Sequence, residues 1–299
     1  MSDQSIDFSL ALFASIEGGS PYWSQEISTL GVDQVYQKLY SGGYTSLRPS
    51  AEKITQRLKN ISIDHLHQEI SDSGGTFLTP KSEFWPEPLN DLVAPPIGLI
   101  VTNPEIFARS EKSVAIVGTR NPSSYGARIA SEFSAGFVDR QWQVVSGGAY
   151  GIDSNAHRGA LAAEGETIVV LASGIAENYP AGHERLFAEI RESGSLVSEV
   201  MPHTQARPER FLTRNRLIAA LTRGTIVIEA AFRSGSLRTA RDAAALYRMV
   251  MAVPGPITSP TSDGCHRLIQ ERCAEIVTSP SDAIELMAPL TGTLARDGS

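Results

Sequence analysis

Cysteine and long apolar runs are the first things that this sequence has little of. Its 299 residues include two cysteines, Cys265 and Cys273, which cannot form a disulfide framework and which we expect to be buried thiols. No apolar run reaches the length of a membrane span, and residues 1–7 lack the basic start and apolar stretch of a secretory signal. These absences predict a cytoplasmic protein with no membrane partner.

The short motifs that mark common catalytic and cofactor sites are missing as well. The sequence has no GxGxxG fingerprint, no GxxxxGK[ST] phosphate loop, no GxSxG elbow and no HExxH pair. Its six histidines and two cysteines do not stand at metal-ligand spacing. We therefore expect no cofactor, no bound metal and no catalytic residue.

Lysine disappears partway along the chain. All five lysines lie at or before Lys112, so every later cation is arginine, whose planar fork matches two phosphate oxygens at once. Residues 1–112 carry eight cations against fourteen anions, whereas residues 113–280 carry seventeen against sixteen. The overall net charge of −7 therefore hides a nearly neutral, arginine-rich second part. A phosphate ligand fits this composition, and so does a codon bias towards arginine.

From residue 113 onward, short β-branched runs alternate with amphipathic segments every 25 to 30 residues or so, which predicts a parallel, doubly wound α/β sheet of the extended Rossmann type. The strands are expected at 113–117, 143–146, 167–171, 195–198, 225–228, 249–253 and 275–277. The helices are expected at 127–139, 152–163, 183–192, 209–221, 236–247 and 263–271. Ligands of such a fold bind beyond the carboxyl ends of the strands.

The first part of the chain has a helical pattern instead, with segments at 7–17, 24–30, 32–40 and 51–58 separated by glycine pairs. We predict a small N-terminal helical domain over residues 1–78. A proline-rich linker that docks on the core is expected at 79–112, because six prolines fall between Thr79 and Pro104. The Rossmann-like domain then covers 113–290, and 291–299 is a tail.

Small residues gather where the first two predicted strands end. The turn Gly118–Thr119–Arg120 follows one, and Ser146–Gly147–Gly148–Ala149–Tyr150–Gly151 follows the other. Such turns let backbone amides approach an anion, and the next helix adds its positive end. A plain tight turn is the alternative for the first. Asp153 is expected to cap the helix that follows the second.

The densest group of cations is Arg207, Arg210, Arg214 and Arg216, opposed locally by Glu209 alone. Arg210 and Arg214 share one helical face. This face is either a phosphate-binding surface or an ordinary solvated side of a helix. We expect these arginines to be exposed. A third small-residue loop, Ser234–Gly235–Ser236, follows a later strand that ends at Glu229.

Taken in order, several of these stretches resemble the DNA-processing protein A (DprA/Smf) family. The matching stretches are Val117–Arg120, Val145–Asp153, Ala156–Leu161, Arg214–Ala219, Glu229–Ala230 with Arg233–Leu237 and Thr239–Ala240, Val253–Pro256 and Gly264–Ile269. The resemblance implies an extended Rossmann domain that binds single-stranded DNA in a basic pocket, forms a homodimer and helps to load the RecA recombinase during natural transformation. It also makes the N-terminal helices compatible with a sterile-alpha-motif-like domain. That is a binding role without catalysis.

The resemblance assigns DNA contact to Arg120, the glycine-rich loop to Gly147, Gly148 and Gly151, and the Arg-Asn-Arg motif to Arg214–Arg216. With the physical reasoning above, the candidate DNA- or phosphate-binding residues are Gly118, Thr119, Arg120, Ser146, Gly147, Gly148, Gly151, Arg210, Arg214, Asn215, Arg216, Ser234, Gly235 and Ser236. Tyr125, Tyr150 and Phe211 are candidate stacking platforms. A nucleotide-processing phosphoribohydrolase-like enzyme with a strand-end glutamate, Glu199 or Glu229, is the alternative, and an interaction scaffold is a third.

Overall fold

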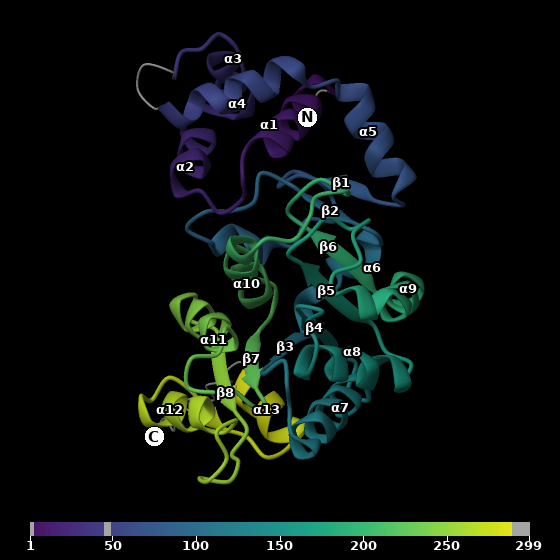
Figure 1. Ribbon diagram of the computed structural model, residues 1–299, viewed down its shortest axis with the longest axis vertical. Coiled ribbons are helices and arrows are strands. Elements are labelled where there is room, and N and C mark those ends of the chain that lie inside the picture. Colours follow the sequence, from purple (N-terminus) through teal and green to yellow (C-terminus); the bar gives the residue numbers. More distant parts are fainter. Residues whose placement is uncertain (1–2, 45–48, 289–299) are drawn as a thin grey trace, which may run out of the picture.

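A computed structural model describes residues 3–44 and 49–288 of the chain (Figure 1). The predicted tail at 291–299 lies outside these residues. Within them, the chain forms an α/β sheet of nine strands, with five helices placed before it in the sequence. The predicted fold class, a mostly parallel doubly wound sheet with N-terminal helices, is confirmed.

The sheet has the order β1-β2-β6-β5-β4-β3-β7-β8-β9. Its strands are β1 (Thr76–Leu78), β2 (Leu99–Val101), β3 (Ser113–Val117), β4 (Gln143–Ser146), β5 (Thr167–Leu171), β6 (Ser195–Ser198), β7 (Gly224–Val227), β8 (Met249–Ala252) and β9 (Glu275–Ile276). Strands β3 to β9 are parallel, so Ala115 pairs with Val145 on one side and with Thr225 on the other. The chain reverses its direction of winding between β3 and β7, where such sheets place their ligand crevice.

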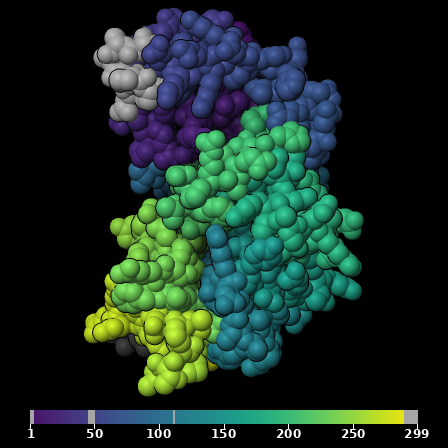
Figure 2. All heavy atoms as spheres, viewed as in Figure 1, coloured from purple at the N-terminus to yellow at the C-terminus, as the bar shows by residue number. Residues whose placement is uncertain are grey.

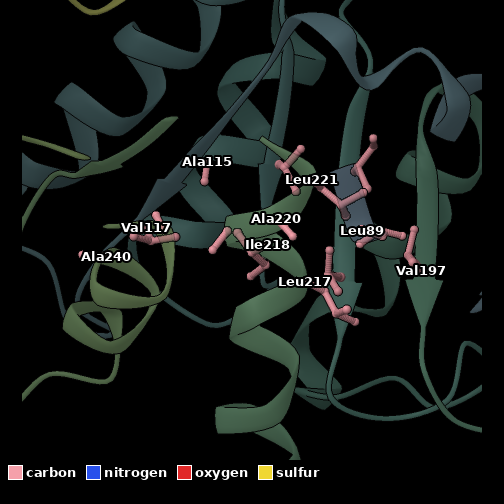
Figure 3. Packing of buried hydrophobic residues seen from close by; sticks show 14 of the residues in the cluster. Leu89, Ala115, Val117, Val197, Leu217, Ile218, Ala220, Leu221 and Ala240 are labelled. Carbon is pink, nitrogen blue, oxygen red and sulfur yellow. The ribbon is translucent and has the colours of Figure 1, made fainter. Parts of the chain in front are cut away.

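Helices cover both faces because alternate strand residues point to opposite sides. They are α6 (Pro104–Ala108), α7 (Ser124–Val138), α8 (Ile152–Ala162), α9 (Glu184–Ser193), α10 (Pro208–Leu221), α11 (Ser236–Ala245), α12 (Asp263–Gln270) and α13 (Pro280–Met287). Ala115 and Val117 pack with α10 and α11, and Figure 3 shows Leu217 and Leu221 of α10 in this layer. Val114 and Ile116 face the layer that holds α7, α8 and α13. These two buried layers fix the strand ends that carry the loops.

The N-terminal helices are α1 (Asp3–Ser15), α2 (Pro21–Leu30), α3 (Val32–Tyr40), α4 (Pro49–Asn60) and α5 (Ile63–Asp72). They bury a core of their own that includes Leu12, Trp23 and Leu39, and they sit at one end of the molecule in Figure 2. Helix α5 was not among the predicted segments. A division of the chain near residue 78 stays a prediction.

Residues 79–112 do more than connect the two parts. They contribute β2, which pairs antiparallel with β1 and with β6, and Leu99 and Val101 are fully buried in the core layer. The segment therefore extends the sheet, which the linker prediction did not include. Cys265 is buried, as expected, but Cys273 is exposed, so the expectation for that thiol is wrong. No helix within the described residues is long and apolar enough to cross a bilayer.

Candidate nucleic-acid interface

A shallow hollow of about 50 Å³ lies over the carboxyl ends of β3, β4 and β5. It is lined by Arg120, Gly147, Gly148, Ala149, Tyr150, Ala172, Tyr179, Pro180 and Phe211. Three loops and the first turn of α10 supply these residues, because the parallel strands end at the same edge. We call this group the aromatic hollow.

Arg120 is the exposed cation of the aromatic hollow. Its guanidinium lies 5.1 Å from the centre of the Phe211 ring, and it makes no ion pair with any carboxylate that the structure describes. Phe211 also meets Tyr179 edge-on, with ring centres 5.5 Å apart. Stacking on an aromatic face keeps the charged fork oriented while it stays in contact with water. The arrangement can therefore receive an anion beside flat rings.

Two tyrosines extend the aromatic surface. Tyr150 is 49% exposed and Tyr179 is 47% exposed, and both line the hollow. The Tyr150 hydroxyl accepts a bond from the amide of Gly182, and its ring meets that of His183 edge-on, with ring centres 4.6 Å apart. Tyr125, the other candidate platform, instead donates its hydroxyl to the carbonyl of Pro254 and does not line the hollow. Tyr179 was not predicted, although its place in the loop that follows β5 puts it at the same ends of the strands as Arg120 and Tyr150.

Arg214 lies beneath the hollow, and the expectation that it is exposed is wrong. It is 6% exposed, and its Nη1 donates to the carbonyl of Val170 at 2.6 Å. A Cβ on Gly147 would come within 1.9 Å of that nitrogen, so only glycine fits above the guanidinium. Burial lowers the pKa of Arg214 to about 10, and the nearby Asp153 carboxylate works against that shift. Arg214 therefore supports the glycine loop from below.

Asp153 holds the same loop from inside. Its Oδ2 accepts from the amide of Ala149 at 3.3 Å, and the amide of Gly147 points to it as well. Burial raises the pKa of this carboxyl, while Arg214 and the loop amides lower it. The N-cap of α8 is Gly151 and not Asp153, so that prediction is wrong. These amides donate to a carboxylate of the protein itself, so they are not available to bind a phosphate in the way that the sequence predicted.

The other predicted loop residues hold the loops together. Gly118 and Thr119 pack at the end of β7, where the Thr119 amide donates to the carbonyl of Glu229. Ser146 is fully buried, and its hydroxyl donates to the carbonyl of Ile116. Gly151 has φ +85° and touches the carbonyl of Thr119. These residues position Arg120 and do not form the surface of the aromatic hollow.

The third predicted loop lies apart from the hollow. The hydroxyls of Ser234 and Ser236 are 2.7 Å apart, and Gly235 is exposed between them. Asn215 is buried and donates weakly, at 3.5 Å, to the carbonyl of Gly235. None of these four residues lines the aromatic hollow. Asn215 thus connects α10 to this loop.

Arg210 and Arg216 face the N-terminal helices. One nitrogen of Arg216, Nη2, donates to both oxygens of Glu199, at 2.5 and 2.7 Å, and the Arg216 side chain is 14% exposed, so the expectation that it is exposed is wrong. Burial raises the pKa of Glu199, and Arg216 opposes that shift. Arg210 pairs with Glu17 through two nitrogens, Nε and Nη2, and its side chain is also 14% exposed, so the expectation of exposure is wrong for Arg210 as well. Arg120 and the buried Arg214 both lie near the Phe211 ring, at 5.1 and 6.0 Å from its centre, whereas Arg216 does not line the aromatic hollow.

The crevice at the point where the winding reverses is filled by Glu229. This carboxylate is 3% exposed and accepts from the amide and hydroxyl of Ser123, at 2.9 and 2.6 Å, and from the hydroxyl of Thr261. It occupies the N-terminus of α7, where a nucleotide phosphate would bind in a related sheet. Within the described residues, no three His, Cys, Asp or Glu side chains gather as a metal site.

Gly151→Ala tests how closely the two loops must approach. A Cβ at this position would lie 2.3 Å from the carbonyl oxygen of Thr119, on a backbone with φ +85°. We expect a loss of at least about 2 kcal/mol in the free energy of unfolding, measured by urea denaturation. Gly235→Ala is the matched control, because a Cβ there meets nothing within 4 Å, and it should stay within about 0.5 kcal/mol of wild type. Equal losses of stability in the two variants would contradict the close approach of the Gly151 loop to Thr119.

The chain is similar in sequence to a known protein family. The family model described as DNA recombination-mediator protein A matches residues 76–288. A DprA protein of Mycobacterium tuberculosis is 48% identical over 186 residues, which cover 62% of this chain and 47% of that protein. Protein Smf of Escherichia coli is 41% identical over 204 residues, covering 68% and 54%. The chain thus spans about half the length of these curated relatives.

Solved structures agree over more of the chain. The DNA processing protein A of Streptococcus pneumoniae superposes with a TM-score of 0.79 at 33% identity, covering 92% of this chain and 95% of that one. The protein from Helicobacter pylori, which binds single-stranded DNA, superposes with a TM-score of 0.64 at 26% identity, covering 72% and 97%.

Proposed function

Because this chain belongs to the DNA recombination-mediator protein A family, we propose that it binds single-stranded DNA at the aromatic hollow. The observation that carries the proposal is the exposed Arg120 guanidinium, stacked on Phe211 beside the half-exposed rings of Tyr150 and Tyr179. Single strands bind where a cation meets the backbone and aromatic faces take the bases, each stacked base contributing about 1–3 kcal/mol. The H. pylori relative, which binds such strands, supports the same ligand.

The binding residues of this proposal differ from the full set of candidates. Arg120, Tyr150, Tyr179 and Phe211 contact the strand, with Gly147 and Gly148 forming the floor. Gly118, Thr119, Ser146, Gly151 and Arg214 shape the loops. Sequence-specific recognition is not expected, because contacts to phosphates and ring faces carry little base information.

The cellular role proposed from the family is to help load the RecA recombinase on single-stranded DNA in natural transformation, as a cytoplasmic homodimer. Sedimentation of the chain would test the dimer, and RecA filament formation with and without the chain would test the loading. We propose no catalysis. The phosphoribohydrolase-like alternative needs a strand-end glutamate facing a ligand, but Glu229 is bonded to Ser123 and Thr261, and Glu199 is paired with Arg216.

A salt titration tests the proposed ligand. Fluorescence anisotropy of a labelled oligo(dT) and of a duplex of equal length is measured at low and at physiological salt. We expect tighter binding of the single strand, with log affinity falling against log salt by about 0.7 for each phosphate that the protein neutralises. An affinity that does not respond to salt would overturn the proposal.

A further inference from the structure

A second cavity, of about 310 Å³, adjoins the aromatic hollow. It lies between α10 and the turn that follows α1, and Ala172 lines both spaces. Its cations are Arg207, Arg210 and Arg214, and its carboxylates are Glu17, Glu199 and Glu209. In Figure 2 the purple N-terminal segment meets the green segment of the core on this side of the molecule. We call this space the arginine cavity.

In the arginine cavity, the Glu17 carboxylate forms an ion pair with the Arg210 guanidinium. The Nε and Nη2 of Arg210 donate to the two oxygens of the Glu17 carboxylate, at 3.1 and 2.6 Å, and Nη1 donates to the carbonyl of Gln205. The hydrogen bond from Arg210 holds the pKa of Glu17 below its usual value. A guanidinium binds two phosphate oxygens with the same forked geometry as a carboxylate. Glu17 thus takes the position that a phosphate would take.

The two side chains of the Arg210–Glu17 pair differ in their exposure to solvent. The Arg210 side chain is 14% exposed, whereas that of Glu17 is 56% exposed. A carboxylate that stays half in water contributes little net stability through its ion pair, because it regains its hydration when it leaves. The guanidinium, by contrast, would remain in the cavity wall. An incoming anion can therefore replace Glu17 without unfolding the turn.

A buried donor in the same wall lacks a partner. Arg214 lines the arginine cavity and is 6% exposed, and its Nε has no hydrogen-bond partner among the described residues. Its Nη1 is already used by the carbonyl of Val170. Buried donors are nearly always paired, so this nitrogen is available to a hydrogen-bond acceptor that enters from the cavity. This observation is independent of the Glu17 contact.

We propose that the arginine cavity is a second phosphate subsite for the same single strand, and that Glu17 closes it in the free protein by occupying Arg210. The inference rests on the proposed function. A strand that lies in the aromatic hollow continues past Ala172, and its next phosphate displaces Glu17 from Arg210. The N-terminal helices thereby regulate the length of strand that the core engages.

A double-mutant cycle tests the subsite, with oligo(dT) as the probe. Glu17→Gln removes the competing charge and should tighten binding by about threefold to fivefold, the effect of one partly exposed ion pair. Arg210→Ala should weaken binding and reduce the salt slope by about 0.7, the contribution of one phosphate. In the double variant the gain from Glu17→Gln should disappear, because it acts through Arg210.

Asp91→Asn is the matched control. Asp91 pairs with Arg248 at 2.6 Å, and the side chains are 57% and 27% exposed, so the variant loses a similar pair and the same charge. Arg248 lies just before β8, at the amino ends of the strands, whereas the hollow lies at their carboxyl ends. We therefore expect the affinity of Asp91→Asn for oligo(dT) to equal that of wild type.

Three outcomes overturn the subsite: no gain with Glu17→Gln, an equal gain with Asp91→Asn, or a gain that persists beside Arg210→Ala. If wild type still binds the single strand in a salt-dependent way, the proposed function survives these outcomes. If wild type does not bind it, the proposed function fails first and the subsite fails with it.

Discussion

Replacing Arg120 with alanine should weaken the binding of single-stranded DNA by about 10- to 100-fold, the value of one hydrogen-bonded contact to a charged group. The salt slope should also fall by about 0.7, because one phosphate contact is lost. The side chain is exposed and forms no ion pair within the described part of the chain, so the melting temperature should not change. Anisotropy titrations and a thermal melt measure the two effects.

Two companion variants make the Arg120 result specific. Arg140→Ala removes the same charge from an exposed arginine just after α7, on the edge of the sheet where β4 begins, and should bind like wild type. Arg120→Lys keeps the charge but loses the planar fork that stacks on Phe211, so it should fall between wild type and Arg120→Ala. Wild-type affinity in Arg120→Ala would remove Arg120 from the site.

Arg214→Ala should instead destabilise the protein, by about 3 kcal/mol at neutral pH. It removes the donor to the carbonyl of Val170, empties the space beneath Gly147 and leaves the buried Asp153 carboxylate without its nearest cation. Removing the cation that offsets a buried charge costs more than losing an exposed contact. Urea denaturation measures the loss, with Arg140→Ala as the control for the change of charge.

The effect of Arg214→Ala should also depend on pH. Burial already raises the folded pKa of Asp153 above its ordinary value, and the loss of Arg214 raises it further. The folded variant therefore binds a proton more readily than the unfolded chain, so its deficit in stability should shrink as the pH falls through the folded pKa of Asp153. A deficit that is absent at neutral pH, or that grows on acidification, would contradict the supporting role of Arg214.

Most of the sheet could be predicted because its central strands are short runs of apolar and β-branched residues between clear turn signals. The predicted β3 to β6 have the observed bounds, the prediction for β7 is shifted by one residue at both ends, and those for β8 and β9 are one residue too long at the C-terminal end. Strands β1 and β2 were missed, since each has three residues and β2 lies in a proline-rich segment. β1 pairs with β2, and β2 pairs with β6, which is distant in sequence, so no local pattern indicates these contacts.

The site was predictable in its loops and not in its pairings. The position of Arg120 after a strand and the small residues of the 147–151 loop indicated the right edge of the sheet. The pairing of Arg210 with Glu17 spans 193 positions, and that of Arg216 with Glu199 joins a helix to a different strand end. An arginine-rich helix looks alike in sequence whether its side chains face solvent or buried carboxylates, so burial had to come from the tertiary structure.

The Asp153 carboxylate inside the glycine loop limits how tightly the loop can bind a ligand. Because it takes up the amides of Gly147 and Ala149, those backbone donors cannot enclose a single terminal phosphate. A ligand is then bound by the ends of flexible side chains and by aromatic ring faces, and such contacts tolerate small shifts in the position of the ligand. If the aromatic hollow binds a single strand as we propose, we expect the strand to shift along it while some contacts persist, whereas a lone nucleotide has no enclosed phosphate site there.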